Sequence, residues 1–111
     1  MEFTTEVQDG VYVVSVQGEI DGSTAPELQD AVMPLLVQDS RVVLELSSVS
    51  FMSSAGLRAM LMFYRHTTEA NSKLVLVGVS HEIQEAMKAT GFLKYFTRAP
   101  GLAEGLQLLG A

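Results

Sequence analysis

Three continuous apolar runs, separated by amphipathic segments, constrain the fold of this chain most. The runs at residues 11–16, 41–46 and 73–78 are apolar on both faces, as expected of strands that are covered on both sides. In the segments at 24–36 and 53–70, apolar residues recur at helical spacing. Alternating strands and helices form a largely parallel sheet with helices packed on it. The pattern therefore predicts an α/β fold.

A hairpin at the N-terminus and two further helices complete the predicted fold. Residues 2–7 have the composition of an edge strand, and Asp9-Gly10 suits the positive φ angles of a tight hairpin turn. Ser80 and Pro100 are placed to open the third helix and the last one. We predict a single domain over residues 1–111, with a mixed, mostly parallel sheet of about four to five strands, an N-terminal hairpin and about four helices.

Two polar stretches, at residues 18–23 and 47–50, are predicted to be loops. The first leads into a helix start, where Thr24 is the expected N-cap and Glu27 its partner in a capping box. Further along the same helix, Pro34 should kink it or loosen its last turn.

Composition excludes several classes of protein. The 111 residues can bury one core, and no apolar run approaches the ~20 residues of a membrane span. The N-terminus lacks the basic and apolar regions of a signal peptide, so we expect a cytoplasmic protein. With no cysteine there are no disulfides and no thiolate metal sites. The net charge of -6 disfavours nucleic acid and membranes as partners and favours proteins with basic patches.

Recognisable catalytic chemistry is absent from the sequence. There is no Gly-x-Gly-x-x-Gly, no Walker loop and no Gly-x-Ser-x-Gly elbow. The two histidines, His66 and His81, lie on different predicted elements, and no motif places either beside a serine. We therefore expect no metal, no cofactor and no catalytic residue, although a small enzyme of flavodoxin-like appearance remains an alternative.

Ser53 and Ser54 stand at the opening of the second predicted helix. Serine is a preferred N-cap, because its side-chain oxygen accepts a bond from a free amide of the first turn. The same free amides and the helix dipole favour negative charge, so a hydroxyl at this point is also well placed to carry a phosphate. The alternative is that both serines only cap the helix.

Two other regions are candidates for partner contact. Residues 21–24 and the serine turn both precede helices that follow strands, so they should emerge close together at one edge of the sheet. Gly22 would let a partner approach the backbone there. The second candidate is the helix face formed by Ala59, Met62 and Phe63, which is more apolar than a solvated face needs to be. Ordinary loops and a helix face covered by the third helix are the respective alternatives.

Three segments of the chain resemble the STAS domain family, and within it the stand-alone anti-anti-sigma factors, or anti-sigma factor antagonists. Residues 18–25, Gly-Glu-Ile-Asp-Gly-Ser-Thr-Ala, are similar to the family's Gly-Glu-Leu-Asp loop and first helix start. Residues 51–57, Phe-Met-Ser-Ser-Ala-Gly-Leu, resemble its Asp-Ser-Ser/Thr-Gly-Leu phosphorylation motif. Residues 90–96, Thr-Gly-Phe-Leu-Lys-Tyr-Phe, resemble the segment after its third helix.

The resemblance implies a partner-switching function. In this family the unmodified antagonist binds and sequesters an anti-sigma factor that is also a serine kinase, so a sigma factor is released. The kinase then phosphorylates the antagonist with ATP and the complex dissociates, until a metal-dependent serine phosphatase restores the antagonist. The antagonist itself is expected to be a monomer or weak dimer that is not an enzyme.

Carried over to this chain, the motif makes Ser54 the phosphoacceptor, two residues before the motif's glycine. The implied partner-binding residues are Asp21, Gly22, Ser23, Thr24, Ser53, Ala55, Gly56, Leu57, Arg58 and Met62. Ser53 stands where the family frequently has aspartate, which makes it a competing acceptor, and Ala55 replaces the second hydroxyl residue. A STAS adaptor in a signalling or lipid-transport assembly, with no sigma factor involved, is the alternative function.

Overall fold

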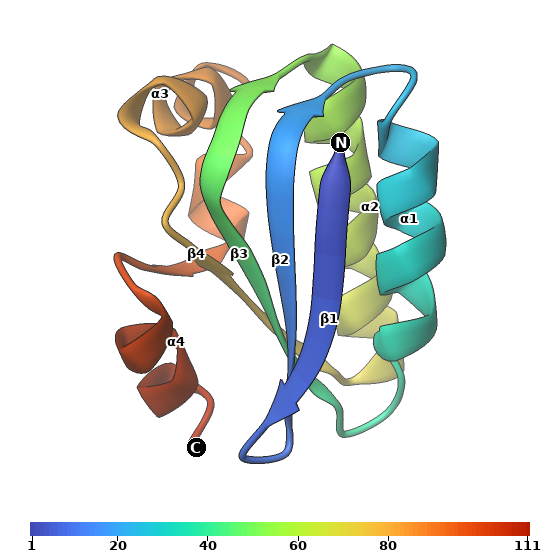
Figure 1. Ribbon diagram of the computed structural model, residues 1–111, viewed down its shortest axis with the longest axis vertical. Coiled ribbons are helices and arrows are strands. Elements are labelled where there is room, and N and C mark those ends of the chain that lie inside the picture. The colour runs from blue at the N-terminus through green and yellow to red at the C-terminus, as the bar shows by residue number, and fades with distance from the viewer.

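The sheet contains five strands, and their spatial order, β1-β2-β3-β4-β5, is also their order in the chain. The computed structural model describes all residues 1–111 (Figure 1). The strands are β1 (Glu2–Gln8), β2 (Val11–Ile20), β3 (Arg41–Met52), β4 (Lys73–Val77) and β5 (Thr97–Ala99). β1 pairs with β2 antiparallel and the other three pairs are parallel, which confirms the predicted mixed sheet with its N-terminal hairpin.

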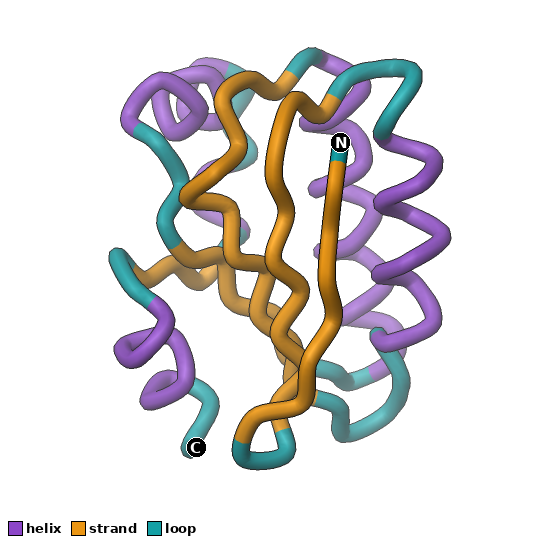
Figure 2. The backbone as a smooth tube through the Cα atoms, viewed as in Figure 1, coloured by secondary structure: helices purple, strands orange, loops and turns teal.

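Helices cover both faces of this sheet (Figures 1 and 2). They are α1 (Ala25–Val32), α2 (Ser54–Ala70), α3 (His81–Ala89) and α4 (Leu102–Leu108), with short 3₁₀ turns at Met33–Leu35 and Leu93–Tyr95. The core against α1, α2 and α3 includes Val14 and Leu44. The smaller core beside α4 includes Val13 and Val43. Alternate residues of a strand point to opposite faces, so the continuous apolar runs supply both cores.

The local signals in the sequence are mostly confirmed. Asp9 and Gly10 both have positive φ, as a two-residue hairpin turn requires. Pro34 lies in the 3₁₀ turn that follows α1, so the last turn of this helix is loosened as predicted. The Ser80 hydroxyl accepts a hydrogen bond from the Ile83 amide at 3.2 Å and so caps α3. The last helix begins at Leu102, two residues after the predicted start.

The predicted loop at 18–23 is partly wrong and the one at 47–50 is wholly wrong, because β2 and β3 extend through these residues. β2 continues through residues 18–20 and β3 through residues 47–50. Gln17 pairs with Ser48 and Gly18 with Val49, with register shifts on either side of these pairs. Backbone hydrogen bonds to the neighbouring strand hold this polar sequence extended, and the register shifts accommodate its irregular pattern.

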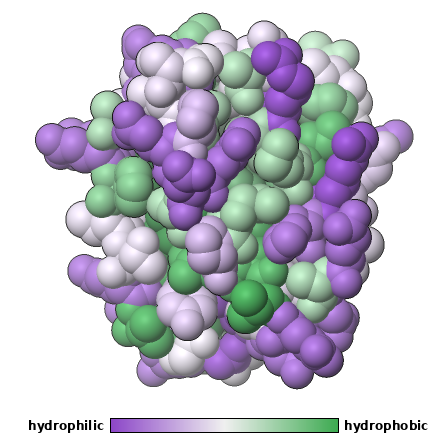
Figure 3. Space-filling model, turned by 90° about the vertical axis from the view of Figure 1, so that its right-hand side faces the viewer, coloured by the Kyte–Doolittle hydropathy of each residue, from purple (hydrophilic) through white to green (hydrophobic).

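The predicted apolar partner face of α2 is also wrong for two of its three residues. Ala59 and Phe63 have no exposed surface and belong to the main core, whereas Met62 is 43% exposed. α2 contacts α1 as well as the sheet, so neighbours cover a wide arc of it. Leu57 and Met60 are buried on the same helix, so the covered arc is wide enough to include Ala59 and Phe63 as well, which the helical pattern alone does not reveal. Figure 3 shows the side of the molecule on which α1 lies, where hydrophilic side chains project and apolar ones show between them.

Candidate partner-binding site

The loop before α1 and the serine turn meet at the carboxyl ends of β2 and β3. Ile20 and Met52, the last residues of these strands, are paired neighbours in the sheet. The Ser53 amide donates a hydrogen bond to the Ile20 carbonyl at 2.9 Å, which joins the start of α2 to the end of β2. The loop before α1 and the start of α2 therefore lie side by side at one end of the molecule, at the top of Figure 1.

Gly56 lets α2 approach β2 closely at this end. A Cβ atom on Gly56 would lie 2.9 Å from the Ile20 carbonyl oxygen and 2.6 Å from Cγ of Met52. The carbonyl is the same one that accepts the Ser53 amide. A glycine at this position is thus a packing requirement of the helix start.

The two adjacent serines have different environments. Ser53 is the N-cap residue, half-buried, and its hydroxyl oxygen accepts a hydrogen bond from the Gly56 amide at a long 3.5 Å. Ser54 is the first residue of α2 and is exposed. The first-turn amides of Ser54 and Ala55 have no intrahelical acceptor, so they are available to water or to an anion.

The loop before α1 is organised by the carboxylate of Asp21. It accepts hydrogen bonds from the Ser23 amide at 2.9 Å, the Ser23 hydroxyl at 2.8 Å and the Thr24 amide at 3.1 Å. These bonds, that from the Ser23 hydroxyl most of all, lower the pKa of the Asp21 carboxyl below its usual value. The loop therefore holds a fixed negative charge at neutral pH.

The predicted capping box is wrong. Thr24 makes no side-chain cap bond to α1. Instead its hydroxyl accepts from the Asp21 amide and donates to the Glu19 carbonyl, both at 2.8 Å. The Thr24 amide, which Glu27 was predicted to accept, donates instead to the Asp21 carboxylate.

The predicted site residues divide by exposure. Gly56 and Leu57 are buried, so they support the surface from beneath. The exposed members are Gly22, Ser23, Ser54, Arg58 and Met62. The half-buried members are Asp21, Thr24, Ser53 and Ala55. Sequence reasoning missed Ile20, whose carbonyl oxygen connects the two halves of the site; a backbone contact of this kind leaves no signal in residue types.

Comparison with known proteins identifies the family. The family model of the STAS domain matches residues 2–105 of the chain. The chain belongs to the STAS domain family. This STAS domain is 32% identical over 92 residues to the anti-sigma-B factor antagonist of Staphylococcus aureus, an alignment covering 82% of this chain and 85% of the relative. The resemblance inferred from the three sequence segments is thus confirmed.

Solved structures give the same family. The crystal structure of an anti-sigma factor antagonist from Mycobacterium paratuberculosis matches with 33% identity and a TM-score of 0.84, over 99% of this chain and 94% of that one. The phosphorylated form of the Bacillus cell fate determinant SpoIIAA matches with 18% identity and a TM-score of 0.73, over 97% and 99% of the two chains, which shows the shared STAS fold.

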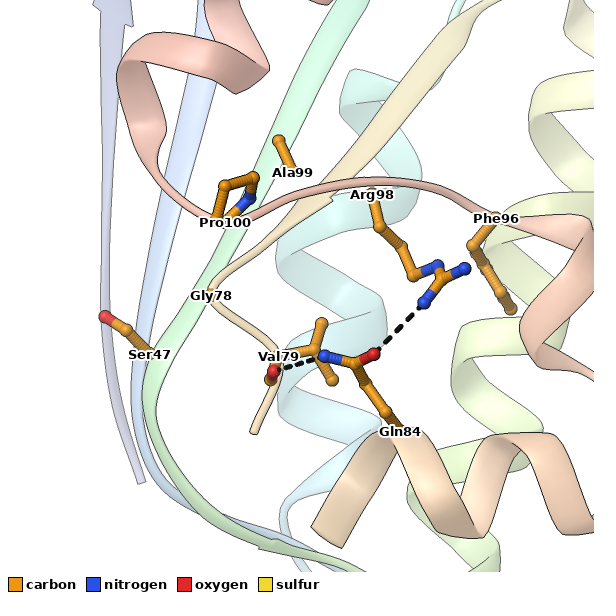
Figure 4. Close-up of a pocket in the computed structure, with 8 residues that line it drawn as sticks. All are labelled: Ser47, Gly78, Val79, Gln84, Phe96, Arg98, Ala99 and Pro100. Atoms are coloured by element: carbon orange, nitrogen blue, oxygen red, sulfur yellow. Dashed lines mark hydrogen bonds between the residues drawn. The ribbon is translucent and has the colours of Figure 1, made fainter. Parts of the chain in front are cut away.

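A cavity of about 660 Å³ lies away from this site, beside β5 and the start of α3. Figure 4 shows its polar groups satisfying one another: the Gln84 amide donates to the Val79 carbonyl, and Arg98 donates to the Gln84 amide oxygen. None of the predicted site residues lines it. It contains no nucleophile and base in contact, so it gives the enzyme alternative no support.

Other chemistry is sparse in this STAS domain. No group of three or more His, Asp or Glu side chains is close enough together to hold a metal ion. His81 lies 3.8 Å from Glu85 on the exposed side of α3, and His66 is half-buried on α2. None of the helices is both long and apolar enough to cross a membrane.

Proposed function

We propose that this STAS domain is an anti-sigma factor antagonist that acts by partner switching. With Ser54 unmodified it binds an anti-sigma factor that is a serine kinase, sequesters it and so releases a sigma factor. Phosphorylation of Ser54 ends this binding, and a metal-dependent serine phosphatase reverses the modification. The relatives named anti-sigma factor antagonist support the general role. The proposal on Ser54 is supported by the geometry of this chain.

The observation that carries the proposal is the exposed Ser54 at the start of a 17-residue helix. A kinase must reach the hydroxyl, and Ser54 offers it on the surface. Ser53 is the competing acceptor, but it is half-buried and its oxygen is engaged in the cap. The two free amides of the first turn favour a phosphate on Ser54 once it is attached.

A phosphate at Ser54 can switch a partner without refolding the domain. It adds about -1.5 to -2 charges at pH 7, and the helix dipole stabilises it by about 0.3–1 kcal/mol. The neighbouring loop already carries the ionised Asp21, so the new charge strengthens a negative surface. A partner carboxylate about 4 Å away would meet a repulsion of up to roughly 4 kcal/mol per unit charge near a surface. Each ~1.4 kcal/mol changes affinity tenfold, so repulsion alone suffices for dissociation.

The test combines phosphorylation with binding. The chain is incubated with ATP and candidate serine kinases from the same genome, and the product is mapped by mass spectrometry. We expect phosphate on Ser54, none in Ser54→Ala, and unchanged modification of the matched control Ser53→Ala. In titrations, Ser54→Ala should bind the kinase persistently and Ser54→Asp should bind poorly. Binding without phosphate would favour the adaptor alternative, and equal affinity of the two Ser54 variants would refute the switch.

A further inference from the structure

The two edges of the sheet are protected very differently. β5, at one edge, has three residues with Arg98 at its centre, and Pro100 follows it directly. β1, at the other edge, has seven residues, all exposed, and contains neither lysine nor proline. Natural proteins blunt edge strands by shortness, charge, proline, bulges or a covering segment. β5 is short, carries a charge and is followed by proline, whereas only Glu2 and Glu6 protect β1.

β1 is also regular enough to template another strand. Its register with β2 runs without a shift from Glu2–Gln17 to Gln8–Val11. The residues flanking a two-residue hairpin turn form a hydrogen-bonded pair, and such pairs alternate along an antiparallel ladder. Counting back from Gln8, the backbone groups of Phe3, Thr5 and Val7 point away from β2. These three residues therefore present six unpaired backbone groups along the edge.

We propose that this edge pairs with the β1 strand of a second copy of the chain, antiparallel and centred on Thr5. In this register Thr5 faces its own counterpart, and Phe3 faces Val7 of the other copy. Every outward backbone group then gains a partner, because Phe3, Thr5 and Val7 all fall in hydrogen-bonded pairs. Phe3 and Val7 are 38% and 66% exposed in the single chain, so the pairing also covers apolar surface.

The charged side chains of β1 are compatible with this register. Glu2 would face Gln8 of the second copy and Glu6 would face Thr4, so no carboxylate stands directly opposite another. The two Glu6 side chains lie diagonally and both chains are acidic, so salt should strengthen the association by screening. An antiparallel two-fold pairing directs the two Ser54 ends in opposite directions. The pair would therefore offer two separate partner sites.

The first experiment measures mass in solution by sedimentation velocity over a concentration series, at low and high salt. The wild-type chain should move from 12.0 kDa towards twice that mass as concentration and salt rise. Val7→Lys places a charge on the edge and should weaken association at least tenfold. The matched control is Val37→Lys, since Val37 is 54% exposed but lies outside the sheet. Thermal melting checks that both variants fold. A wild-type mass of one chain up to millimolar concentration would overturn the proposal.

The second experiment tests the register by disulfide cross-linking. No native cysteine can interfere, because the chain has none. In the proposed pairing two Thr5 Cα atoms lie about 5.5 Å apart, within reach of a disulfide. Two Thr4 residues would lie diagonally, roughly 7–8 Å apart, beyond that reach. Thr5→Cys should form a covalent dimer under mild oxidation and Thr4→Cys should form little. Equal yields for the two variants would rule out pairing centred on Thr5.

Discussion

At the scale of single residues, Asp21 carries the most specific chemistry of the site. Its pKa is lowered chiefly by the Ser23 hydroxyl, and then by the Ser23 and Thr24 amides. Ser23→Ala removes the first of these bonds and keeps the amides, so the Asp21 pKa should rise part of the way to its usual 3.8. An NMR titration of the side-chain carboxyl measures this directly. An unchanged pKa would mean that the amides alone hold the charge.

The same group predicts how stability depends on pH. Because the pKa of Asp21 is lower in the folded chain than in the unfolded chain, its ionised form favours folding. The contribution is fully present above the usual pKa of 3.8 that Asp21 has in the unfolded chain, and it is lost as pH falls through the lower folded value. Urea unfolding of wild type and Asp21→Asn should differ at neutral pH and converge in acid. A constant difference across that range would contradict the linkage.

At the scale of elements, the start of α2 depends on Gly56. Replacing glycine by alanine inside a helix normally stabilises it by about 0.5–1 kcal/mol. Here the new methyl group would meet the Ile20 carbonyl and Met52, so we expect Gly56→Ala to destabilise the domain by about 1–3 kcal/mol. Gly22→Ala is the control, since no atom beyond its two chain neighbours lies within 4 Å of its Cβ position. Denaturant unfolding measures whether Gly56→Ala raises or lowers the free energy of unfolding.

The outer side of α2 gives a second prediction at this scale. Phe63 is fully buried, so Phe63→Ala should cost about 3–5 kcal/mol of stability. Met62, its exposed neighbour, is a proposed partner contact, so Met62→Glu should leave the melting temperature nearly unchanged while weakening kinase binding. Calorimetry and a binding titration on the same samples separate the two effects. Kinase affinity equal to wild type would remove Met62 from the site.

At the scale of the whole molecule, Arg41 ties together three distant segments. From the start of β3 its guanidinium donates to the Leu109 carbonyl at 2.8 Å and to the Asp9 carbonyl at 3.1 Å. The C-terminal segment and the N-terminal hairpin turn lie near each other at the bottom of Figure 1. Arg41→Met keeps most of the stem and removes both bonds. It should cost about 1 kcal/mol and speed hydrogen exchange at both segments; faster exchange at one alone would show that they are not coupled.

Much of this arrangement could be predicted from the sequence. The hairpin turn at Asp9-Gly10, the cap at Ser80 and the loosened helix end at Pro34 depend on neighbouring residues only, and each has its own chemical signal. The order of strands and helices followed from apolar periodicity. The position of Ser54 at a helix start followed from the same local rules, and the structure adds that it is exposed.

Sequence alone therefore determined most of the elements, their order, and where two serines open a helix, since caps, turns and periodicity act over a few residues. It did not place the three-residue strand β5. Tertiary structure decided how far β2 and β3 extend, because a ladder is completed by residues distant in the chain. It also decided that α2 buries Phe63, and that the Asp21 carboxylate rather than Glu27 accepts the Thr24 amide before α1. The same long-range contacts join Ser53 to Ile20 and so bring the two loops of the site together.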